Sequence, residues 1–125
     1  MNNVKYYRCN VCGNLVEKIA DGPGTMVCCN EEMELLIANT VDAAVEKHIP
    51  VVTVENGTIT VVVGEVEHPM LPEHHIGWIS MITDDGIYRK DLVAGDAPKA
   101  NFKTDAKLLD VYAWCNLHGL WKANL

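Results

Sequence analysis

Residues 51–66 read VVTVENGTITVVVGEV, and this stretch is the clearest guide to the fold class. Two runs rich in β-branched residues flank Asn56 and Gly57, a dipeptide that strongly favours a tight hairpin turn. β-branched side chains pack well on a pleated strand and lose rotamer freedom in a helix. The stretch therefore predicts an antiparallel hairpin.

The same pattern continues downstream. Residues 77–93, GWISMITDDGIYRKDLV, place a turn at Asp84-Asp85-Gly86 between two strand-like runs, which predicts a second hairpin. The segments APKANFKTD (97–105) and KLLDVYAWC (107–115) have the composition of further short strands. Residues 41–48 have only a short helix-like spacing close to Pro50, so we expect a linker or loop there. Together these segments predict an all-β fold, with an antiparallel sandwich of about seven strands over residues 37–125.

The first 36 residues form a module of a different kind. They contain four cysteines, Cys9, Cys12, Cys28 and Cys29, and a turn signal, DGPG, at 21–24. A piece this short falls below the roughly 40 residues that a chain usually needs for an adequate core, so it requires a staple such as a metal. We therefore expect two domains, residues 1–36 and residues 37–125.

The cysteine spacing indicates a tetrahedral sulfur site for zinc or for a single iron, and it does not distinguish these metals. The adjacent pair Cys28-Cys29 departs from the zinc-ribbon pattern, in which two residues separate the second pair, and should distort the tetrahedron. A disulfide between these two neighbours would be strained. The start of the chain has no apolar segment typical of a signal peptide, which favours the reducing cytoplasm and thiolates.

The charge of the chain limits its partners. The 125 residues carry a net charge of −7, with a pI near 5.1 and with acids and bases mixed along the sequence. Such a surface repels phosphate backbones, which disfavours nucleic-acid binding. No stretch reaches the roughly 18 apolar residues of a membrane span. We expect a cytoplasmic globular protein without nucleic-acid or membrane partners.

The predicted sandwich holds all five histidines, which are His48, His68, His74, His75 and His118. Pro69 favours an extended backbone at His68. If residues 74–76 are extended as well, His74 and His75 point to opposite sides, so only one of them can join His68 at a common metal. Spacing does not choose between these two.

Cys115 and His118 come after the strand-like run KLLDVYAW (107–114) and read as a loop ligand pair, and Gly119 lets the backbone turn tightly around a site. Four histidines and one thiolate would make five mixed nitrogen and sulfur ligands. This set suits iron better than structural zinc, since zinc prefers four ligands. One coordination position would stay open.

At these residues the chain resembles desulfoferrodoxin, the two-iron form of superoxide reductase. The resemblance runs through YRCNVCGN (7–14), VCCNEEM (27–33), EKHIPV (46–51), HPMLPEHHIGWI (68–79), GDAP (95–98) and CNLHGLWKA (115–123). It implies a desulforedoxin-like N-terminal domain with an iron on Cys9, Cys12, Cys28 and Cys29, and an immunoglobulin-like sandwich with a catalytic iron. The catalytic iron would have His48, His68, His74 and His118 as equatorial ligands and Cys115 as the axial thiolate. The family pattern thus selects His74 over His75, where related sequences often carry an aromatic residue.

The resemblance also implies the activity, which is reduction of superoxide to hydrogen peroxide in an anaerobic or microaerophilic cell. Lys47 would attract superoxide and support proton delivery, and Glu46 resembles the carboxylate that occupies the sixth position of the oxidised iron. A rubredoxin-like electron donor and a homodimer are expected on the same grounds. The alternatives are a non-enzymatic two-iron electron-transfer protein and a structural zinc ribbon joined to a binding sandwich.

Overall fold

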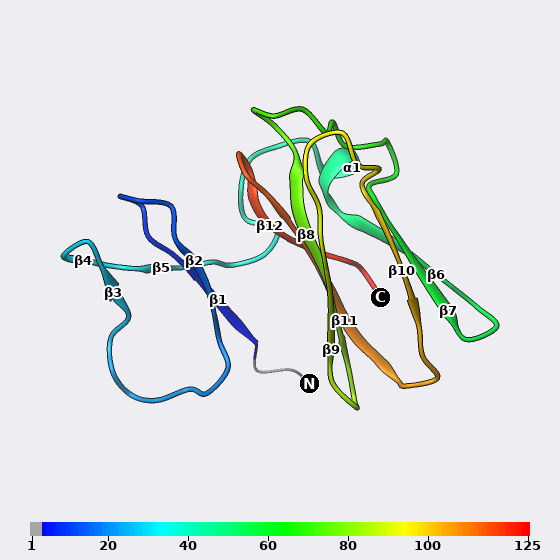
Figure 1. Ribbon diagram of the computed structural model, residues 1–125, viewed down its shortest axis with the longest axis horizontal. Helices are drawn as coiled ribbons and strands as arrows, with labels where there is room; N and C mark the ends of the chain where they lie inside the picture. Colours follow the sequence, from blue (N-terminus) through cyan, green and yellow to red (C-terminus); the bar gives the residue numbers. More distant parts are fainter. Residues whose placement is uncertain (1–3) are drawn as a thin grey trace. The chain divides into compact units, whose positions relative to one another are not determined.

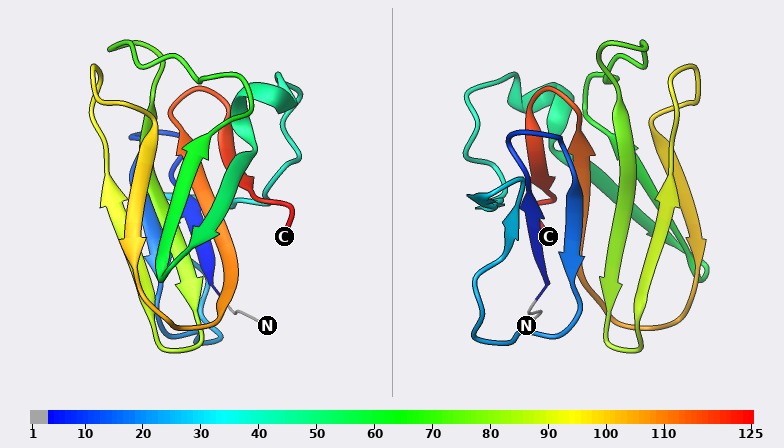
Figure 2. Two further views of the ribbon diagram at one scale, coloured as in Figure 1. Left: turned by 90° about the vertical axis from the view of Figure 1, so that its right-hand side faces the viewer. Right: turned by 60° about the vertical axis from the view of Figure 1, so that its left-hand side comes forward.

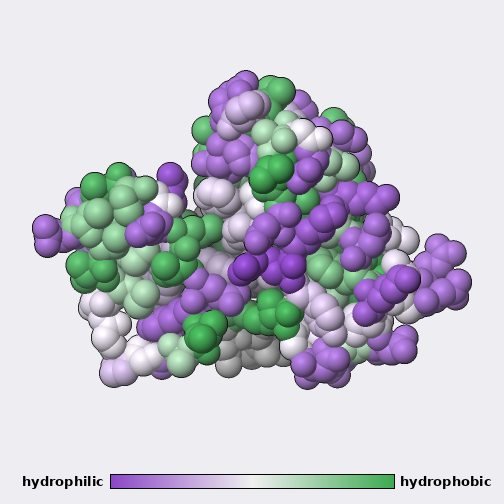
Figure 3. Space-filling view, viewed as in Figure 1, coloured by the Kyte–Doolittle hydropathy of each residue, from purple (hydrophilic) through white to green (hydrophobic). Residues whose placement is uncertain are grey.

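The computed structural model describes residues 4–125, and the chain forms two compact units, residues 1–37 and 38–125 (Figure 1). Almost all regular structure in the described residues is β, with one short helix. No helix among these residues is long and apolar enough to cross a membrane. On the face drawn in Figure 3, hydrophilic and hydrophobic residues are interspersed.

The smaller unit has five short strands: β1 (Lys5–Arg8), β2 (Leu15–Lys18), β3 (Val27–Cys28), β4 (Glu31–Glu32) and β5 (Glu34–Leu35). One antiparallel sheet has the order β2-β1-β5, and β3 and β4 form a separate hairpin. Among the described residues of this unit, the buried apolar ones are Tyr6, Cys9 and Met33. Such a small buried set agrees with a unit that needs a metal to hold it together.

The larger unit has seven strands: β6 (Pro50–Glu55), β7 (Thr58–Val63), β8 (Ile76–Thr83), β9 (Ile87–Asp91), β10 (Lys99–Lys103), β11 (Leu108–Cys115) and β12 (Gly119–Lys122). They form two antiparallel sheets, β10-β7-β6 and β12-β11-β8-β9. Figure 2 shows these sheets as the two layers of a sandwich. The predicted fold class, an antiparallel sandwich of seven strands, is confirmed.

Both predicted hairpins are present. The turn between β6 and β7 has positive φ at Asn56 (49°) and Gly57 (76°), the backbone that a two-residue turn of this kind requires. The turn between β8 and β9 contains Gly86 at a φ of 155°, and β8 pairs with β9 up to Ile82 and Ile87. Local turn chemistry therefore sets the register of both strand pairs.

The core lies between the two sheets and follows the alternation of the strands. On β7, Ile59, Val61 and Val63 are buried, and the pattern of alternating burial continues along the strand. On β11, Val111, Ala113 and Cys115 are fully buried, and all three belong to the core cluster. The period of two thus carries the Cys115 side chain inward at the end of a core strand.

The expectation of a linker or loop up to residue 48 is wrong for its last four residues. Helix α1 (Val45–His48) is a single turn, with the Ile49 N–H donating to the Val45 carbonyl at 3.1 Å. A backbone hydrogen bond from a distant segment supports this turn, because the Val66 N–H donates to the Glu46 carbonyl at 2.8 Å. A helix of four residues is too short to be stable by itself, so its neighbours decide its conformation.

Candidate metal centres

The four cysteines of the smaller unit converge. Their sulfur atoms all lie within 4.8 Å of one another, and all four are free thiols. The Cys12 and Cys28 sulfurs are 3.7 Å apart, and those of Cys28 and Cys29 are 3.9 Å apart. Four sulfurs held tetrahedrally at about 2.3 Å from one ion would be about 3.8 Å apart. The distances therefore fit a tetrahedral metal and are far too long for disulfides.

A tight backbone turn shapes the first cysteine pair. The Cys9 N–H donates to the Asn14 carbonyl at 2.8 Å, and the Gly13 N–H donates to the Cys9 carbonyl at 2.9 Å. Gly13 has a φ of 82°, which glycine adopts without steric cost. The Cys12 N–H points at the Cys9 sulfur, 3.5 Å away, and is the largest cause that lowers the pKa of the Cys9 thiol to about 6. This turn therefore favours a thiolate at Cys9.

The adjacent cysteines reach the cluster because the backbone is left-handed at Cys29 (φ 53°) and Asn30 (φ 62°). The Asn14 side-chain amide donates to the Cys28 sulfur at 3.6 Å, a contact that sequence reasoning missed. The Cys12 side chain, followed by those of Cys28 and Cys9, raises the pKa of the Cys29 thiol to about 12. A bound cation is what would allow four crowded sulfurs to be thiolates together.

Four imidazoles of the larger unit form a closed square. Neighbouring rings are 4.6–5.0 Å apart between centroids and nearly perpendicular, at 78–84°. The order around the square is His48, His68, His74 and His118. His48 and His74 lie across it at 6.2 Å, with an angle of 29° between their planes. The rings thus surround a common centre.

The ring nitrogens have the spacing of metal ligands. His48 Nε2 lies 3.2 Å from His68 Nε2 and 3.1 Å from His118 Nδ1. Two nitrogens at about 2.1 Å from one ion, at a right angle to each other, would be about 3.0 Å apart. His74 Nε2 is buried and has no hydrogen-bond partner among the described residues. A metal at the centre would satisfy this otherwise orphaned atom.

Cys115 supplies the fifth donor. Its sulfur lies within 4.8 Å of the ligand atoms of His48, His68 and His74, and 3.9 Å from His118 Nδ1. The residue ends β11, so the expectation of a loop position is wrong for Cys115. Burial raises the pKa of its thiol, while the backbone N–H groups of His118 and Leu117 act in the opposite direction. One buried thiolate and four imidazoles, here called the histidine-thiolate centre, are a donor set that suits iron.

Two histidines of the square are oriented by backbone carbonyls. His48 Nδ1 lies 2.7 Å from the Ala44 carbonyl, and His68 Nδ1 lies 2.6 Å from the Pro69 carbonyl. Donation from Nδ1 leaves Nε2 free of a proton and directed at the centre. Burial lowers the pKa of both imidazoles, that of His68 to about 4. Both rings are therefore neutral ligands at neutral pH.

Trp121 is a supporting residue that sequence reasoning missed. Its ring is fully buried and stacks on His48, with 4.8 Å between centroids and 29° between the planes. Its Nε1–H donates to the His118 carbonyl at 3.0 Å. Trp121 thus contacts two members of the square from a single position on β12.

His75 stays outside the square. Its Nδ1 lies 3.1 Å from the Leu71 carbonyl, so its ring supports the loop that carries His74.

Lys47 is exposed, and its charge contributes to lowering the pKa of His74, after burial, His118 and other neighbours. The ammonium group is therefore within electrostatic reach of the square.

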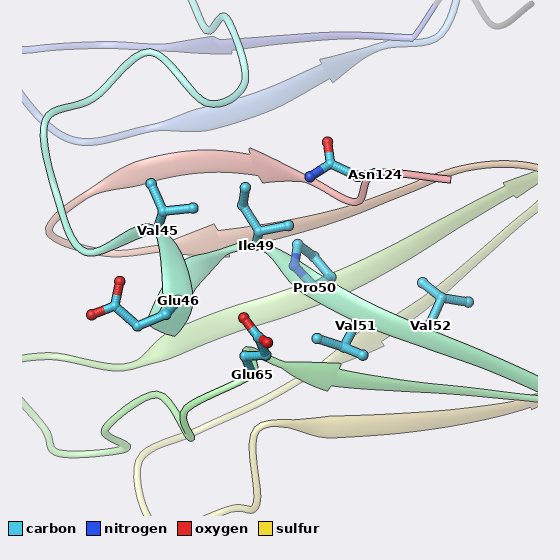
Figure 4. A pocket seen from close by; sticks show the side chains of 8 residues that line it. All are labelled: Val45, Glu46, Ile49, Pro50, Val51, Val52, Glu65 and Asn124. Atoms are coloured by element: carbon cyan, nitrogen blue, oxygen red, sulfur yellow. The ribbon is translucent and has the colours of Figure 1, made fainter.

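Glu46 does not join the cluster of ligand atoms around the square. Its side chain lines an open hollow of about 450 Å³, together with Glu65 of the connection after β7 (Figure 4). The other residues of this hollow are Val45, Ile49, Pro50, Val51, Val52 and Asn124, and none of them is a candidate ligand. Glu46 thus borders a hollow that contains no candidate ligand.

Comparison with known proteins finds relatives over both units. The family model of the desulfoferrodoxin N-terminal domain matches residues 1–36, and that of desulfoferrodoxin matches residues 40–124. A desulfoferrodoxin homolog of Methanothermobacter thermautotrophicus is 55% identical over 117 residues, covering 92% of this chain and 94% of that protein. The desulfoferrodoxin of Desulfarculus baarsii is 47% identical over 120 residues, covering 96% and 95%.

A solved structure is similar over almost the whole chain. The superoxide reductase of Treponema pallidum superposes with a TM-score of 0.80 at 37% identity, covering 98% of this chain and all of that one. The two donor sets, four thiolates in one centre and four imidazoles with a thiolate in the other, match those of the two-iron desulfoferrodoxins. The chain belongs to the desulfoferrodoxin family.

Proposed function

We propose that this protein is a superoxide reductase, which reduces superoxide by one electron to hydrogen peroxide and so removes a reactive oxygen species. The observation that carries this proposal is the square of four imidazoles with a buried thiolate beside it. Iron bound there would supply the electron and an open coordination position. The ligands would be His48, His68, His74, His118 and Cys115, and the second iron would be held by Cys9, Cys12, Cys28 and Cys29.

Cys115 would act as an electron-rich ligand of the iron. A thiolate increases the electron density of the metal that it binds, which favours reduction of an oxygen species. Its burial in the core excludes water from the sulfur, and the nearby N–H groups of Leu117 and His118 tune its charge.

Lys47 would attract the substrate to the site. Superoxide is an anion and the chain carries a net charge of −7, so a local positive charge must guide it. The exposed Lys47 lies next to the candidate ligand His48 in sequence, and its charge contributes to lowering the pKa of His74. Reduction to hydrogen peroxide consumes two protons, and Lys47 would support their delivery through ordered water.

Glu46 would assist release of the product. Its position in the first turn of α1, two residues before His48, leaves an exposed carboxylate near the site. An exposed side chain changes rotamer rapidly, which would let the carboxylate approach when the product leaves. Slower peroxide release by Glu46→Ala, with unchanged reaction with superoxide, would support this role.

The physiological setting is part of the proposal. The exposed positions of Cys12 and Cys29 suit electron entry from a rubredoxin-like donor in the cytoplasm. The edge strand β6, with Val51 and Val54 exposed, would suit pairing in a homodimer.

A metal count with visible spectra, followed by pulse radiolysis, tests the function. Two irons per chain, with a second charge-transfer band that appears on oxidation, and fast consumption of superoxide without release of oxygen are expected. Two irons with no reaction would favour the alternative, a non-enzymatic electron-transfer protein. Zinc in place of iron, or a single iron without the second band, would contradict the assignment of the histidine-thiolate centre.

A further inference from the structure

His74 differs from His48 and His68 in how it is held. It lies in the connection between β7 and β8, where the His74 and Leu71 backbones exchange two hydrogen bonds of 2.9 and 3.1 Å. His48 and His68 are oriented through their Nδ1 atoms. Within residues 4–125, the buried Nε2 of His74 has no hydrogen-bond partner. The direction of this ring therefore depends on where its backbone is placed.

Asn116 makes three hydrogen bonds to that backbone. Its side-chain Oδ1 accepts from the His75 N–H at 2.9 Å, and its Nδ2 donates to the Glu73 carbonyl at 3.1 Å. Its own N–H donates to the His75 carbonyl at 3.2 Å. These bonds flank His74 on both sides.

We propose that Asn116 is a positioning residue that ties the His74 segment to the Cys115 segment, and so fixes a histidine relative to the thiolate. Asn116 follows Cys115 directly, which makes the link as short as the chain allows. The site needs a donor and an acceptor on one short side chain, and asparagine supplies both. The inference rests on the proposed function, because it assumes iron between these ligands.

Removing the Asn116 hydrogen bonds would weaken iron binding at the histidine-thiolate centre. Without the two side-chain bonds, the loop of His74 keeps its own turn, the contact of His75 Nδ1 with the Leu71 carbonyl and the backbone bond from Asn116 to His75. The buried Nε2 of His74 has no hydrogen-bond partner within the described residues to direct the ring. Loss of outer groups that orient metal ligands typically reduces metal affinity by about 10–100-fold. The four-cysteine centre shares no ligand with this site and serves as an internal reference.

The experiment compares Asn116→Ala and Asn116→Asp with the unchanged full-length protein. Asn116→Ala removes both side-chain bonds. Asn116→Asp keeps the size and the acceptor but loses the donor to Glu73, so it keeps the test informative if Asn116→Ala does not fold. Release of iron to a ferrous chelator is followed in the absorption bands of both centres, together with the electron paramagnetic resonance spectrum of the oxidised histidine-thiolate centre.

We expect about tenfold faster iron release from the histidine-thiolate centre in both variants, an altered resonance spectrum, and unchanged release from the four-cysteine centre. Asn101→Ala is the matched control, because it removes an exposed amide that accepts from Thr60 Oγ1 at 2.9 Å on β10. It should leave both rates unchanged.

Two results would overturn the inference while the function stands. One is wild-type release and an unaltered spectrum in both Asn116 variants of a protein that reduces superoxide. The other is an equal acceleration at both centres, which would show general loosening. A wild-type chain that holds no iron on the histidines would instead overturn the proposed function, and the inference with it.

Discussion

Lys47 provides a sharp test at the scale of single residues. We expect Lys47→Gln to lower the second-order rate with superoxide by about tenfold, because the local attraction is lost on an anionic chain. The wild-type rate should fall with ionic strength, and the variant should lose this dependence or reverse it. Pulse radiolysis at several salt concentrations measures both. Lys47→Arg is the control that keeps the charge, and an equal rate and salt slope in all three proteins would refute the steering role.

Cys115 is both a candidate ligand and a core residue. We expect Cys115→Ser to retain the sandwich, at a cost of about 1–3 kcal/mol for a buried hydroxyl. Turnover of superoxide and the charge-transfer band of the histidine-thiolate centre should be lost, since the thiolate is absent. Steady-state kinetics and visible spectra measure this, and circular dichroism checks the fold. Unaltered superoxide reduction by the variant would show that the thiolate is dispensable.

Buried histidines make the iron-free protein sensitive to acid. An unfolded His68 binds a proton near its usual pKa of 6.5, whereas burial lowers its pKa in the folded chain to about 4. Stability should therefore be level above pH 7 and fall as the pH decreases from about 6.5 to about 4. His68 alone would contribute a loss of about 2 kcal/mol at pH 5. The pKa values of His48 and His74 are lowered too, which acts in the same direction.

Urea unfolding of the iron-free protein at pH 7.5 and pH 5 measures this dependence. The variant His68→Gln should show a smaller difference between the two conditions, because the titrating group is gone. Equal stability of the iron-free protein at both values would contradict the lowered pKa.

At the scale of elements, helix α1 depends on the segment after β7. A Cβ at Gly64 would lie 2.7 Å from the Glu46 carbonyl oxygen and 2.9 Å from the Lys47 carbonyl carbon, closer than packed atoms allow. We expect Gly64→Ala to displace the turn that carries Lys47 and His48, with a loss of stability of about 1–3 kcal/mol. Iron should be lost selectively from the histidine-thiolate centre, and superoxide reduction should slow.

Metal analysis and chemical unfolding measure these effects. Gly22→Ala is the matched control, because a Cβ there has no atom within 4 Å outside its immediate neighbours. Full iron occupancy and wild-type kinetics in Gly64→Ala would show that the close packing does not position the helix.

At the scale of the whole molecule, the two units divide the nine candidate ligands without sharing any. Residues 1–37 hold the four-cysteine cluster and few buried residues, whereas residues 38–125 hold a continuous core. We expect Cys12→Ser to release the first iron and loosen residues 1–37, because a small unit loses the binding energy of its metal. The sandwich should keep its iron and its reaction with superoxide in a single turnover.

Hydrogen exchange read by mass spectrometry, with iron counts and single-turnover kinetics, measures this separation. Loss of protection throughout residues 38–125, or loss of the second iron, would show that the units depend on each other. Slower turnover with a rubredoxin-like donor, beside an intact single turnover, would identify the first iron as an electron relay.

Features that lie within one short segment could be predicted from the amino acids alone. Asn56-Gly57 between β-branched runs specifies its hairpin, since the turn backbone and the pairing of its neighbours are local properties. The four cysteines indicated a metal site for the same reason, although their spacing left zinc and iron open. The choice of His74 over His75 came from the family pattern, because an extended segment presents both.

The meeting of distant segments became visible only in the folded chain. The helical turn of His48 is stabilised by Val66, and Cys115 is buried because the alternation of β11 meets the opposite sheet. Trp121 and Asn116 carry no local signal of their role, since each acts on ligands far away in the chain. A metal site of this kind depends on distances between packed elements, and no single segment contains those distances.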